Sequence, residues 1–213
     1  MNRLAVDWQK ETKIYERPHP RLAAMAQVIR ALPHRRILDA GCSTGTLETL
    51  LPRDFAYYGC DVTDHAQARL APGRFRQIDF NRSSDLSAFA GEGIDMVHIG
   101  GVLEYLDRPQ ELLRSTRQLV AGGGRLVVSI INFQSFMYRG PRNHHLGWIY
   151  KPVLEELRQA LADTGWAIER QMPFFGPRRL GTWLANAWSE RLGVDHPLTR
   201  RRAQQFILQA RAL

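Results

Sequence analysis

The sequence predicts an α/β protein with a parallel, doubly wound sheet in one domain, and three observations lead to this prediction. Short apolar segments with the composition of strands alternate along the chain with segments whose apolar residues recur at helical spacing. Residues 94–100, IDMVHIG, are almost all apolar, as expected for a parallel strand covered on both faces. The chain has 213 residues, enough for one sizeable domain, and its sequence contains no internal repeat, low-complexity segment or interdomain linker.

The first half of the chain is expected to form two helices and four strands. A helix is predicted at 20–32, where apolar residues recur at helical spacing and Pro33 follows as a stop. The segment TLETLL, residues 46–51, predicts a brief second helix. Between and after these helices, short apolar segments predict strands at 35–41, 56–62, 75–80 and 94–100.

The second half continues the alternation. Asp107 is the expected N-cap of a helix that has Pro109 near its start and ends at the three glycines 122–124. A further helix is predicted at 152–164, where Gly165 ends it. The remaining expected elements are strands at 125–131, 166–175 and 203–213, and a helix within 181–193.

The charge is unevenly distributed along the chain. The net charge is +8, but residues 1–36 and 139–213 are basic (+5 and +6) whereas residues 37–138 are mildly acidic (−3). The basic ends could meet a phosphorylated substrate, an anionic membrane surface or nucleic acid, or they could be solvated arginines without a specific partner. The tight basic stripe of a nucleic-acid footprint is missing from the sequence.

Composition also sets an expectation for the compartment. No apolar run reaches the roughly 18 residues of a membrane-spanning helix, and the first 22 residues have no apolar signal core. Two cysteines, Cys42 and Cys60, do not make a disulfide framework. We therefore expect a cytoplasmic protein.

The segment ILDAGCSTG, residues 37–45, joins the first predicted strand to the brief helix. A dinucleotide-binding turn needs Gly-x-Gly-x-x-Gly, but this turn has Gly41, Ser43 and Gly45 followed by Thr46, so NAD and FAD are disfavoured. The Gly-Lys-Ser/Thr of a phosphate-binding loop is missing as well. A tight turn of this kind suits a small carboxylate or the edge of a ribose.

Acidic residues end three successive predicted strands. Asp39 closes the first, Asp61 the second and Asp79 the third, and in an open α/β sheet these ends line one crevice. Asp61 lies 20 residues after Gly41, where a carboxylate can accept both hydroxyls of a ribose. Asp79 offers an acceptor for an exocyclic amine, and Phe80 an apolar wall for a purine. The ordered series therefore predicts a nucleoside-binding crevice.

These motifs resemble, in order and spacing, those of class I S-adenosylmethionine-dependent methyltransferases. The resemblance covers residues 35–133, and its most specific part is IDMVHIGGVLEYLDRPQELLRSTRQLVAGGGRLVVSIIN. It implies a Rossmann-like seven-stranded sheet with an antiparallel last strand, and S-adenosylmethionine as cofactor with S-adenosylhomocysteine as product. It further implies that residues 1–34 form a helical cap, 35–131 the cofactor half and 132–213 the substrate half of a single domain.

The resemblance also implies a set of cofactor-binding residues. The methionine part would lie in the turn, the ribose at the second strand, the adenine at the third, and the end of the fourth strand would pass beneath the cofactor. Tyr15 is expected to close over the cofactor as part of a lid. Position by position, these residues are Asp39, Gly41, Cys42, Ser43 and Gly45 for methionine, Asp61 and Val62 for ribose, Asp79 and Phe80 for adenine, and Ile99 and Gly100 beneath.

Two positions depart from the family pattern. Ser43 stands where the middle glycine is usual, which is acceptable if its backbone angles are in an allowed region. Tyr105 stands where a histidine is common after Leu-Glu. Some relatives use that histidine as a metal ligand or a base, so its replacement argues against either role here, and no metal is expected.

The acceptor is expected to bind against the segment that follows the fifth strand. His144 or His145 is the first candidate for a residue that takes a proton near neutral pH, and both could instead be exposed loop residues. Glu104 and Tyr105 face the same crevice in the family arrangement and are the second choice. Arginines of this segment suit an anionic substrate. His98, within a strand, is read as a buried hydrogen-bonded histidine.

The sequence thus predicts a methyltransferase that acts on a small-molecule or glycan-type acceptor by direct in-line displacement. The alternatives are a methyltransferase of RNA or another nucleic acid, motivated by the basic ends, and a non-catalytic scaffold that binds the cofactor. The helix within 181–193 has an apolar face that could contact a membrane surface or wall the substrate pocket. The sequence does not indicate an oligomeric state.

Overall fold

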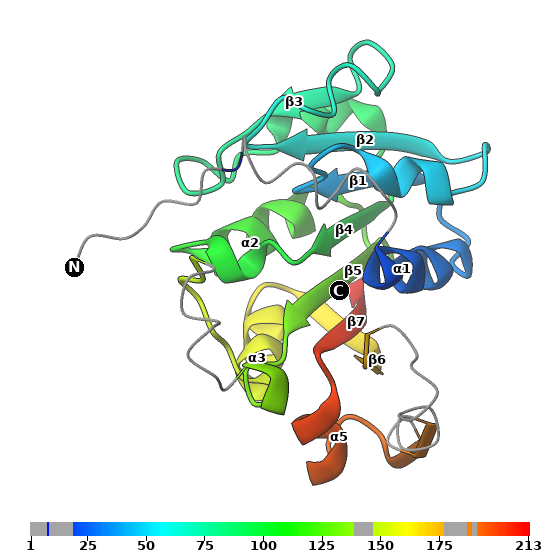
Figure 1. Ribbon diagram of the computed structural model, residues 1–213. Helices are drawn as coiled ribbons and strands as arrows, with labels where there is room; N and C mark the ends of the chain where they lie inside the picture. Colours follow the sequence, from blue (N-terminus) through cyan, green and yellow to red (C-terminus); the bar gives the residue numbers. More distant parts are fainter. Residues whose placement is uncertain (1–7, 9–18, 139–146, 177–186, 189–190) are drawn as a thin grey trace.

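The computed structural model describes residue 8 and residues 19–138, 147–176, 187–188 and 191–213 (Figure 1). These residues contain a seven-stranded sheet in the order β3-β2-β1-β4-β5-β7-β6. Only β7 runs antiparallel to its neighbours, β5 and β6, which confirms the expected sheet with its antiparallel last strand. The strands are β1 (Arg36–Ala40), β2 (Ala56–Asp61), β3 (Phe75–Gln77), β4 (Met96–Gly100), β5 (Arg125–Ile131), β6 (Trp166–Phe174) and β7 (Gln205–Ala212).

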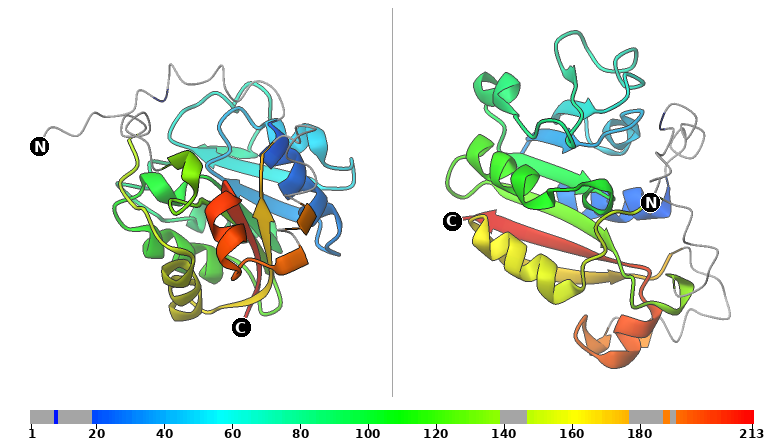
Figure 2. Two further views of the ribbon diagram at one scale, coloured as in Figure 1. Left: turned by 60° about the horizontal axis from the view of Figure 1, so that its bottom comes forward. Right: turned by 90° about the vertical axis from the view of Figure 1, so that its left-hand side faces the viewer.

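Helices cover both faces of the sheet (Figure 2). Helix α1 lies on one face, and α2 and α3 lie on the other. The α-helices are α1 (Pro20–Arg30), α2 (Pro109–Leu119), α3 (Leu154–Asp163) and α5 (Pro197–Arg202), and short 3₁₀ helices span Thr46–Leu50, Ser87–Glu92, Leu103–Tyr105 and Phe136–Tyr138.

Alternate residues of the central strands fill two hydrophobic cores. In β2, Tyr57 packs in the core beneath α1, while its neighbour Tyr58 packs in the core beneath α2 and α3. Met96 and Val97 divide in the same way in β4. Both faces of these strands are therefore buried, which explains why they read as almost continuous apolar segments in the sequence.

The strand order places a crevice at the carboxyl ends of β1 and β4. From β1 the chain moves outward to β2 and β3, and then returns to add β4 and β5 on the other side of β1. Ligands of open α/β sheets bind where the strand order reverses in this way. In the parallel register Asp39 of β1 lies opposite Gly59 of β2 and His98 of β4, so the reversal point carries two ionisable side chains.

Four expectations about elements differ from the structure. Helix α2 begins at Pro109, so its N-cap is Arg108 rather than Asp107, whose backbone N–H donates to Asn81 Oδ1 instead. Strand β3 ends at Gln77, which leaves the expected residues 78–80 in the loop that follows. The brief helix at 46–50 is a 3₁₀ helix, and α5 was not predicted. Most of the predicted helix within 181–193 lies outside the described residues.

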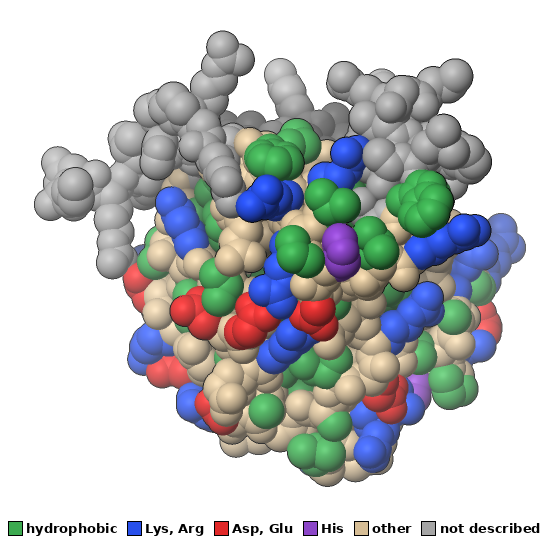
Figure 3. Space-filling view, turned by 90° about the horizontal axis from the view of Figure 1, so that it is seen from below, with side chains coloured by type: hydrophobic (Ala, Val, Ile, Leu, Met, Phe, Trp, Pro, Cys, Tyr) green, Lys and Arg blue, Asp and Glu red, His purple; other side chains and the backbone are tan. Residues whose placement is uncertain are grey.

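Charged groups of both signs are interspersed on the surface. In the view of Figure 3, Lys and Arg side chains lie beside Asp and Glu side chains. The best-connected group lies between α3 and α5, where Arg200 pairs with Glu155 and Asp195, and Arg158 also reaches Asp195 at 2.9 Å. No helix among the described residues is long and apolar enough to cross a bilayer.

Candidate functional site

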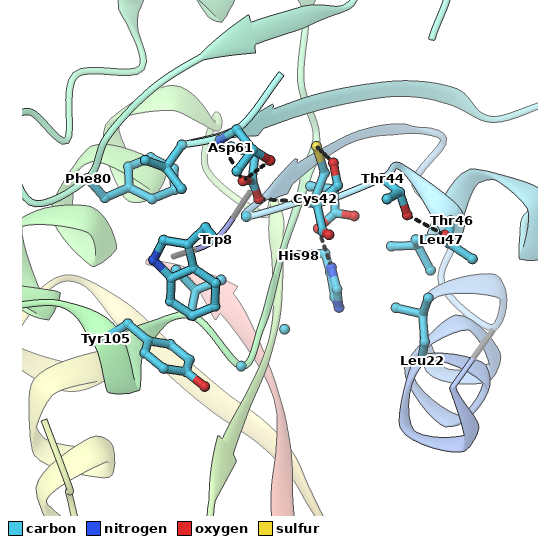
Figure 4. Close-up of a pocket in the computed structure, with 18 of the residues that line it drawn as sticks. Trp8, Leu22, Cys42, Thr44, Thr46, Leu47, Asp61, Phe80, His98 and Tyr105 are labelled. Carbon is cyan, nitrogen blue, oxygen red and sulfur yellow. Dashed lines mark hydrogen bonds and ion pairs between the residues drawn. The ribbon is translucent and has the colours of Figure 1, made fainter. Parts of the chain in front are cut away.

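A cavity of about 1100 Å³, including its open mouth, lies at the carboxyl ends of β1, β2 and β4 (Figure 4). Most of the residues proposed from the sequence line it. They are Asp39, Gly41, Cys42, Ser43, Asp61, Val62, Asp79, Phe80, Gly100 and Tyr105.

The glycine turn forms one wall of the cavity. Gly41 has φ +85°, and a Cβ there would lie 2.2 Å from Val102 Cγ2, so only glycine fits. Ser43 adopts φ +49°, in the left-handed region, although it is not glycine. Its backbone N–H donates to Asp61 Oδ2 at 2.7 Å, so β2 braces the turn.

Asp61 lies at the end of β2 and faces the cavity. Its Oδ1 accepts from the backbone N–H and the hydroxyl of Thr63, each at 3.0 Å. With the bond from Ser43, three donors fix the carboxylate. Since a carboxylate offers about four lone-pair sites, it can still accept from a ligand hydroxyl.

Asp79 and Phe80 follow β3 at the far end of the cavity. Asp79 Oδ1 accepts from the backbone N–H of Asn81 at 3.0 Å, and its Oδ2 lies 3.3 Å from Arg82 Nε. The ring of Phe80 is 8% exposed and forms an apolar wall. An acceptor beside a flat apolar surface suits a purine with an exocyclic amine.

Asp39 forms the floor of the cavity with two hydrogen-bonded neighbours. Tyr57 Oη donates to its Oδ2 at 2.5 Å, and His98 Nδ1 lies 2.6 Å from its Oδ1. His98 was expected to be a buried hydrogen-bonded histidine, and it is one, but it also lines the cavity. No sequence motif indicated this second property, because β1 and β4 are 59 residues apart at this pair.

Aromatic rings gather beside Tyr105. The ring of Trp8 meets Tyr105 edge-on at 4.6 Å and lies between it and Phe80 (Figure 4). Trp148 Nε1 donates to Tyr105 Oη at 3.1 Å. Trp148 also contacts the rings of Phe133 and Tyr138, at 5.1 and 5.7 Å between ring centroids. The cavity thus has an aromatic wall at the side away from the glycine turn.

Glu104 does not face the crevice as expected. It is fully buried, and its Oε1 accepts from the backbone N–H of Ile131 at 2.5 Å. Its own carbonyl accepts from the N–H groups of Ile149 and Tyr150. Burial raises the pKa of this carboxyl. Glu104 therefore ties β5 and the segment at 149–150 to the turn that follows β4, and it is not among the residues that line the cavity.

Two other predicted residues lie behind the cavity wall. Gly45, with φ +69°, packs its backbone against Leu70, and Ile99 is fully buried in the core. Tyr15, His144 and His145 lie outside the described residues.

Helix α1 supplies cavity residues that the sequence did not indicate. His19 caps the helix and Arg21 follows in its first turn, and both line the cavity. A Cβ on Gly101 would lie 2.5 Å from Arg21 Nη1, and Arg21 Nε is buried without a hydrogen-bond partner among the described residues. Burial and the charge of Arg21 lower the pKa of His19.

The described part of the chain contains no group of three or more His, Cys, Asp or Glu side chains that could hold a metal ion. Cys42 and Cys60 are free and buried, and burial is the main cause that raises the pKa of both thiols. A raised pKa leaves less of each thiol in the nucleophilic thiolate form.

Comparisons with known proteins show the family of this chain. Residues 11–187 match the model of a methyltransferase domain. This match covers most of the chain. The chain belongs to the methyltransferase-domain family.

A curated relative of this chain is the ubiquinone biosynthesis O-methyltransferase of Pseudomonas aeruginosa, 27% identical over 169 residues. The alignment covers 75% of this chain and 66% of the relative, so the chain spans slightly less than two thirds of that protein.

Solved structures show the same fold. A methyltransferase from Haloferax volcanii, in complex with the Trm112 activator, matches with a TM-score of 0.69 and 18% identity over 96% of this chain and 94% of that chain. The 1,6-didemethyltoxoflavin N1-methyltransferase of Burkholderia thailandensis, with bound S-adenosylhomocysteine, matches with a TM-score of 0.64 and 16% identity over 96% of this chain and 83% of that one. Likeness at this level identifies the class I methyltransferase fold.

Proposed function

We propose that this methyltransferase binds S-adenosylmethionine in the cavity and transfers its methyl group to a small-molecule acceptor by in-line displacement. One observation carries the proposal. Asp39, Asp61 and Asp79, at the ends of β1 and β2 and just after β3, line a single cavity beside a glycine turn. They present separate acceptors for the three donor groups of the cofactor, which are the ammonium, the ribose diol and the adenine amine.

Each part of the cofactor has a matching group in the cavity. Asp61 would hold the ribose, and Asp79 with Phe80 the adenine. Asp39 would accept from the ammonium of the methionine part. Arg21, whose Nε is buried beside the cavity without a partner among the described residues, would pair with the carboxylate of the methionine part.

The bound cofactor supplies a methyl carbon that is already activated by the sulfonium. The chain has to hold this carbon in line with the acceptor and to keep water away. Alignment of two reactants can contribute about 7–11 kcal/mol to the lowering of a barrier. The buried floor and the aromatic wall are suited to this task, because they are anchored to β1, β4 and the segment around Trp148.

The aromatic wall favours a flat acceptor. The rings of Trp8 and Tyr105, which both line the cavity, offer faces and edges on which a planar molecule can stack. The curated relative is named as an O-methyltransferase of ubiquinone biosynthesis, which supports an oxygen atom as the acceptor. His144 and His145 remain the candidates for taking the hydroxyl proton. A cytoplasmic location also remains a proposal, consistent with two free cysteines.

Replacing Asp61 tests the cofactor assignment. Asp61→Ala removes the carboxylate that would accept from the ribose, so we expect affinity for S-adenosylhomocysteine to fall at least about tenfold. Isothermal titration measures this change, and thermal unfolding checks that the variant folds. Asp54→Ala is the matched control, because Asp54 pairs with Arg35 on the surface, away from the cavity. Unchanged affinity in Asp61→Ala would refute the ribose assignment.

Turnover is tested with a methyl-labelled cofactor and a panel of phenols, aromatic acids and amines. Transfer to a phenol or an aromatic acid supports the proposed acceptor. Cofactor binding without turnover on any acceptor would favour the scaffold alternative.

A further inference from the structure

A chain of three buried polar side chains crosses the floor of the cavity. Tyr57 on β2, Asp39 on β1 and His98 on β4 are 0%, 3% and 2% exposed. Both oxygens of the central carboxylate are engaged, one by Tyr57 Oη at 2.5 Å and the other by His98 Nδ1 at 2.6 Å. An ionised carboxylate can only accept hydrogen bonds, so both neighbours act as donors.

This carboxylate keeps acceptor capacity toward the cavity. About four lone-pair sites are available, of which Tyr57 and His98 occupy two, and Asp39 lines the cavity. Burial of a carboxylate is costly unless donors satisfy it. Burial beside Asp39 also raises the pKa of Tyr57, which keeps its hydroxyl protonated and able to donate. The hydrogen bonds from these two donors therefore offset the cost of burying a carboxylate that faces the ligand cavity.

The imidazole of His98 is fixed on its other sides as well. Its Nε2 lies 3.3 Å from Met25 Sδ on α1. A Cβ on Gly100 would lie 2.7 Å from His98 Cε1, so the ring has room only because residue 100 is glycine. The ring thus has little freedom to turn away from Asp39.

We infer that His98 and Tyr57 are positioning residues that hold the Asp39 carboxylate toward the cavity, where it accepts from the ammonium of the cofactor's methionine part. The inference rests on the proposed function. Neither residue needs to touch the reacting atoms. Without either donor, the carboxylate is free to turn away from the cavity, and the ammonium loses its partner.

Two ligands separate this role from a general structural one. S-adenosylhomocysteine contains the ammonium, whereas 5′-methylthioadenosine has the same nucleoside and a thioether without the amino-acid part. His98→Leu and Tyr57→Phe each remove one donor to Asp39. His98→Asn returns an amide donor near the position of Nδ1. Tyr58→Phe is the matched control, because Tyr58 packs in the opposite core and its hydroxyl accepts from Arg36.

Dissociation constants for both ligands, measured by isothermal titration, give the result. We expect His98→Leu and Tyr57→Phe to weaken S-adenosylhomocysteine binding about tenfold, the loss of one hydrogen bond to a charged group, and to change 5′-methylthioadenosine binding by less than about twofold. His98→Asn should recover most of the affinity, and Tyr58→Phe should lose none.

Equal weakening of both ligands, or no weakening of either, would overturn the inference. Tyr57→Phe removes a single oxygen atom. If His98→Leu does not fold, the dissociation constants of Tyr57→Phe for the two ligands test the inference. If the wild-type protein binds neither ligand, the proposed function itself fails. If it binds both and the variants do not discriminate between them, only the role of His98 and Tyr57 fails.

Discussion

Glu104 shows how burial changes the behaviour of one residue. Burial raises its pKa, so this carboxyl holds its proton to a higher pH in the folded protein than in the unfolded chain. The folded state then binds more protons than the unfolded state between the two pKa values, and stability decreases as the pH rises through this interval. A neutral side chain of the same shape does not titrate, so it does not cause this decrease in stability.

Glu104→Gln is therefore expected to raise the melting temperature relative to the wild type at pH 8, with a difference that shrinks toward pH 4. Thermal unfolding at both pH values measures it. Glu111→Gln, at an exposed position paired with Arg108, serves as control and should show little change. A Glu104→Gln effect of the same size at both pH values would contradict the buried carboxyl as its cause.

The sequence identified those site residues that stand at the end of a predicted strand. Asp39, Asp61 and Asp79 were found because each follows an apolar strand, and the carboxyl ends of parallel strands meet at one edge. The orientation of Glu104 could not be predicted, because neighbouring residues of a short 3₁₀ turn point in different directions and no period reveals which one enters the cavity. His98 and Arg21 reach the cavity only through tertiary packing.

Among the elements, α1 depends on a histidine cap. His19 Nδ1 accepts from the backbone N–H of Arg21 at 3.2 Å, which requires an unprotonated nitrogen. Burial and Arg21 lower the pKa of His19, so its folded-state value is below its ordinary one. The stability that this cap contributes is present above the ordinary pKa and is lost as the pH falls through the lowered one.

His19→Asn is expected to keep the cap at every pH, because an amide oxygen accepts in place of the imidazole. The variant should match the wild type at pH 8 and melt at a higher temperature at pH 5. His19→Ala should lose about 1 kcal/mol at pH 8. Thermal unfolding at the two pH values measures both variants. If the melting temperatures of the wild type and of His19→Asn changed with pH in the same way, the His19 cap would not be the cause of that pH dependence.

Helices and strands whose apolar residues recur at a regular spacing were predicted correctly. Their first and last residues were predicted less accurately. Helices α1 and α3 and the strands of both halves were found from apolar spacing. Asp107 was a wrong N-cap because Pro109 fixes the first helical residue, which leaves the cap position to Arg108. Helix α5 is too short, at six residues, to show a period.

At the scale of the whole molecule, the net charge of +8 is partly neutralised in place. Glu169 lies within 3.4 Å of both Arg125 and Arg211, and Asp195 pairs with Arg158 and Arg200. Arginines held in such pairs are less available to phosphates, which weakens the nucleic-acid alternative.

We expect binding to a structured RNA to be weak at 50 mM salt and to vanish by 200 mM, as non-specific charge attraction does. Fluorescence anisotropy with a labelled RNA hairpin measures it across the salt series. Tight binding that persists at 200 mM salt would make an RNA methyltransferase the better reading.

The position of β7 has a consequence for biosynthesis. It follows β6 in the chain but lies between β5 and β6, so β6 has no place in the sheet until β7 has left the ribosome. Until then the nascent chain has an unpaired strand edge at β5, and residues 166–174, which contain several apolar side chains, have no strand to pair with. Such edges invite aggregation, so chaperones are expected to matter most while the last eight residues of the sheet are still being translated.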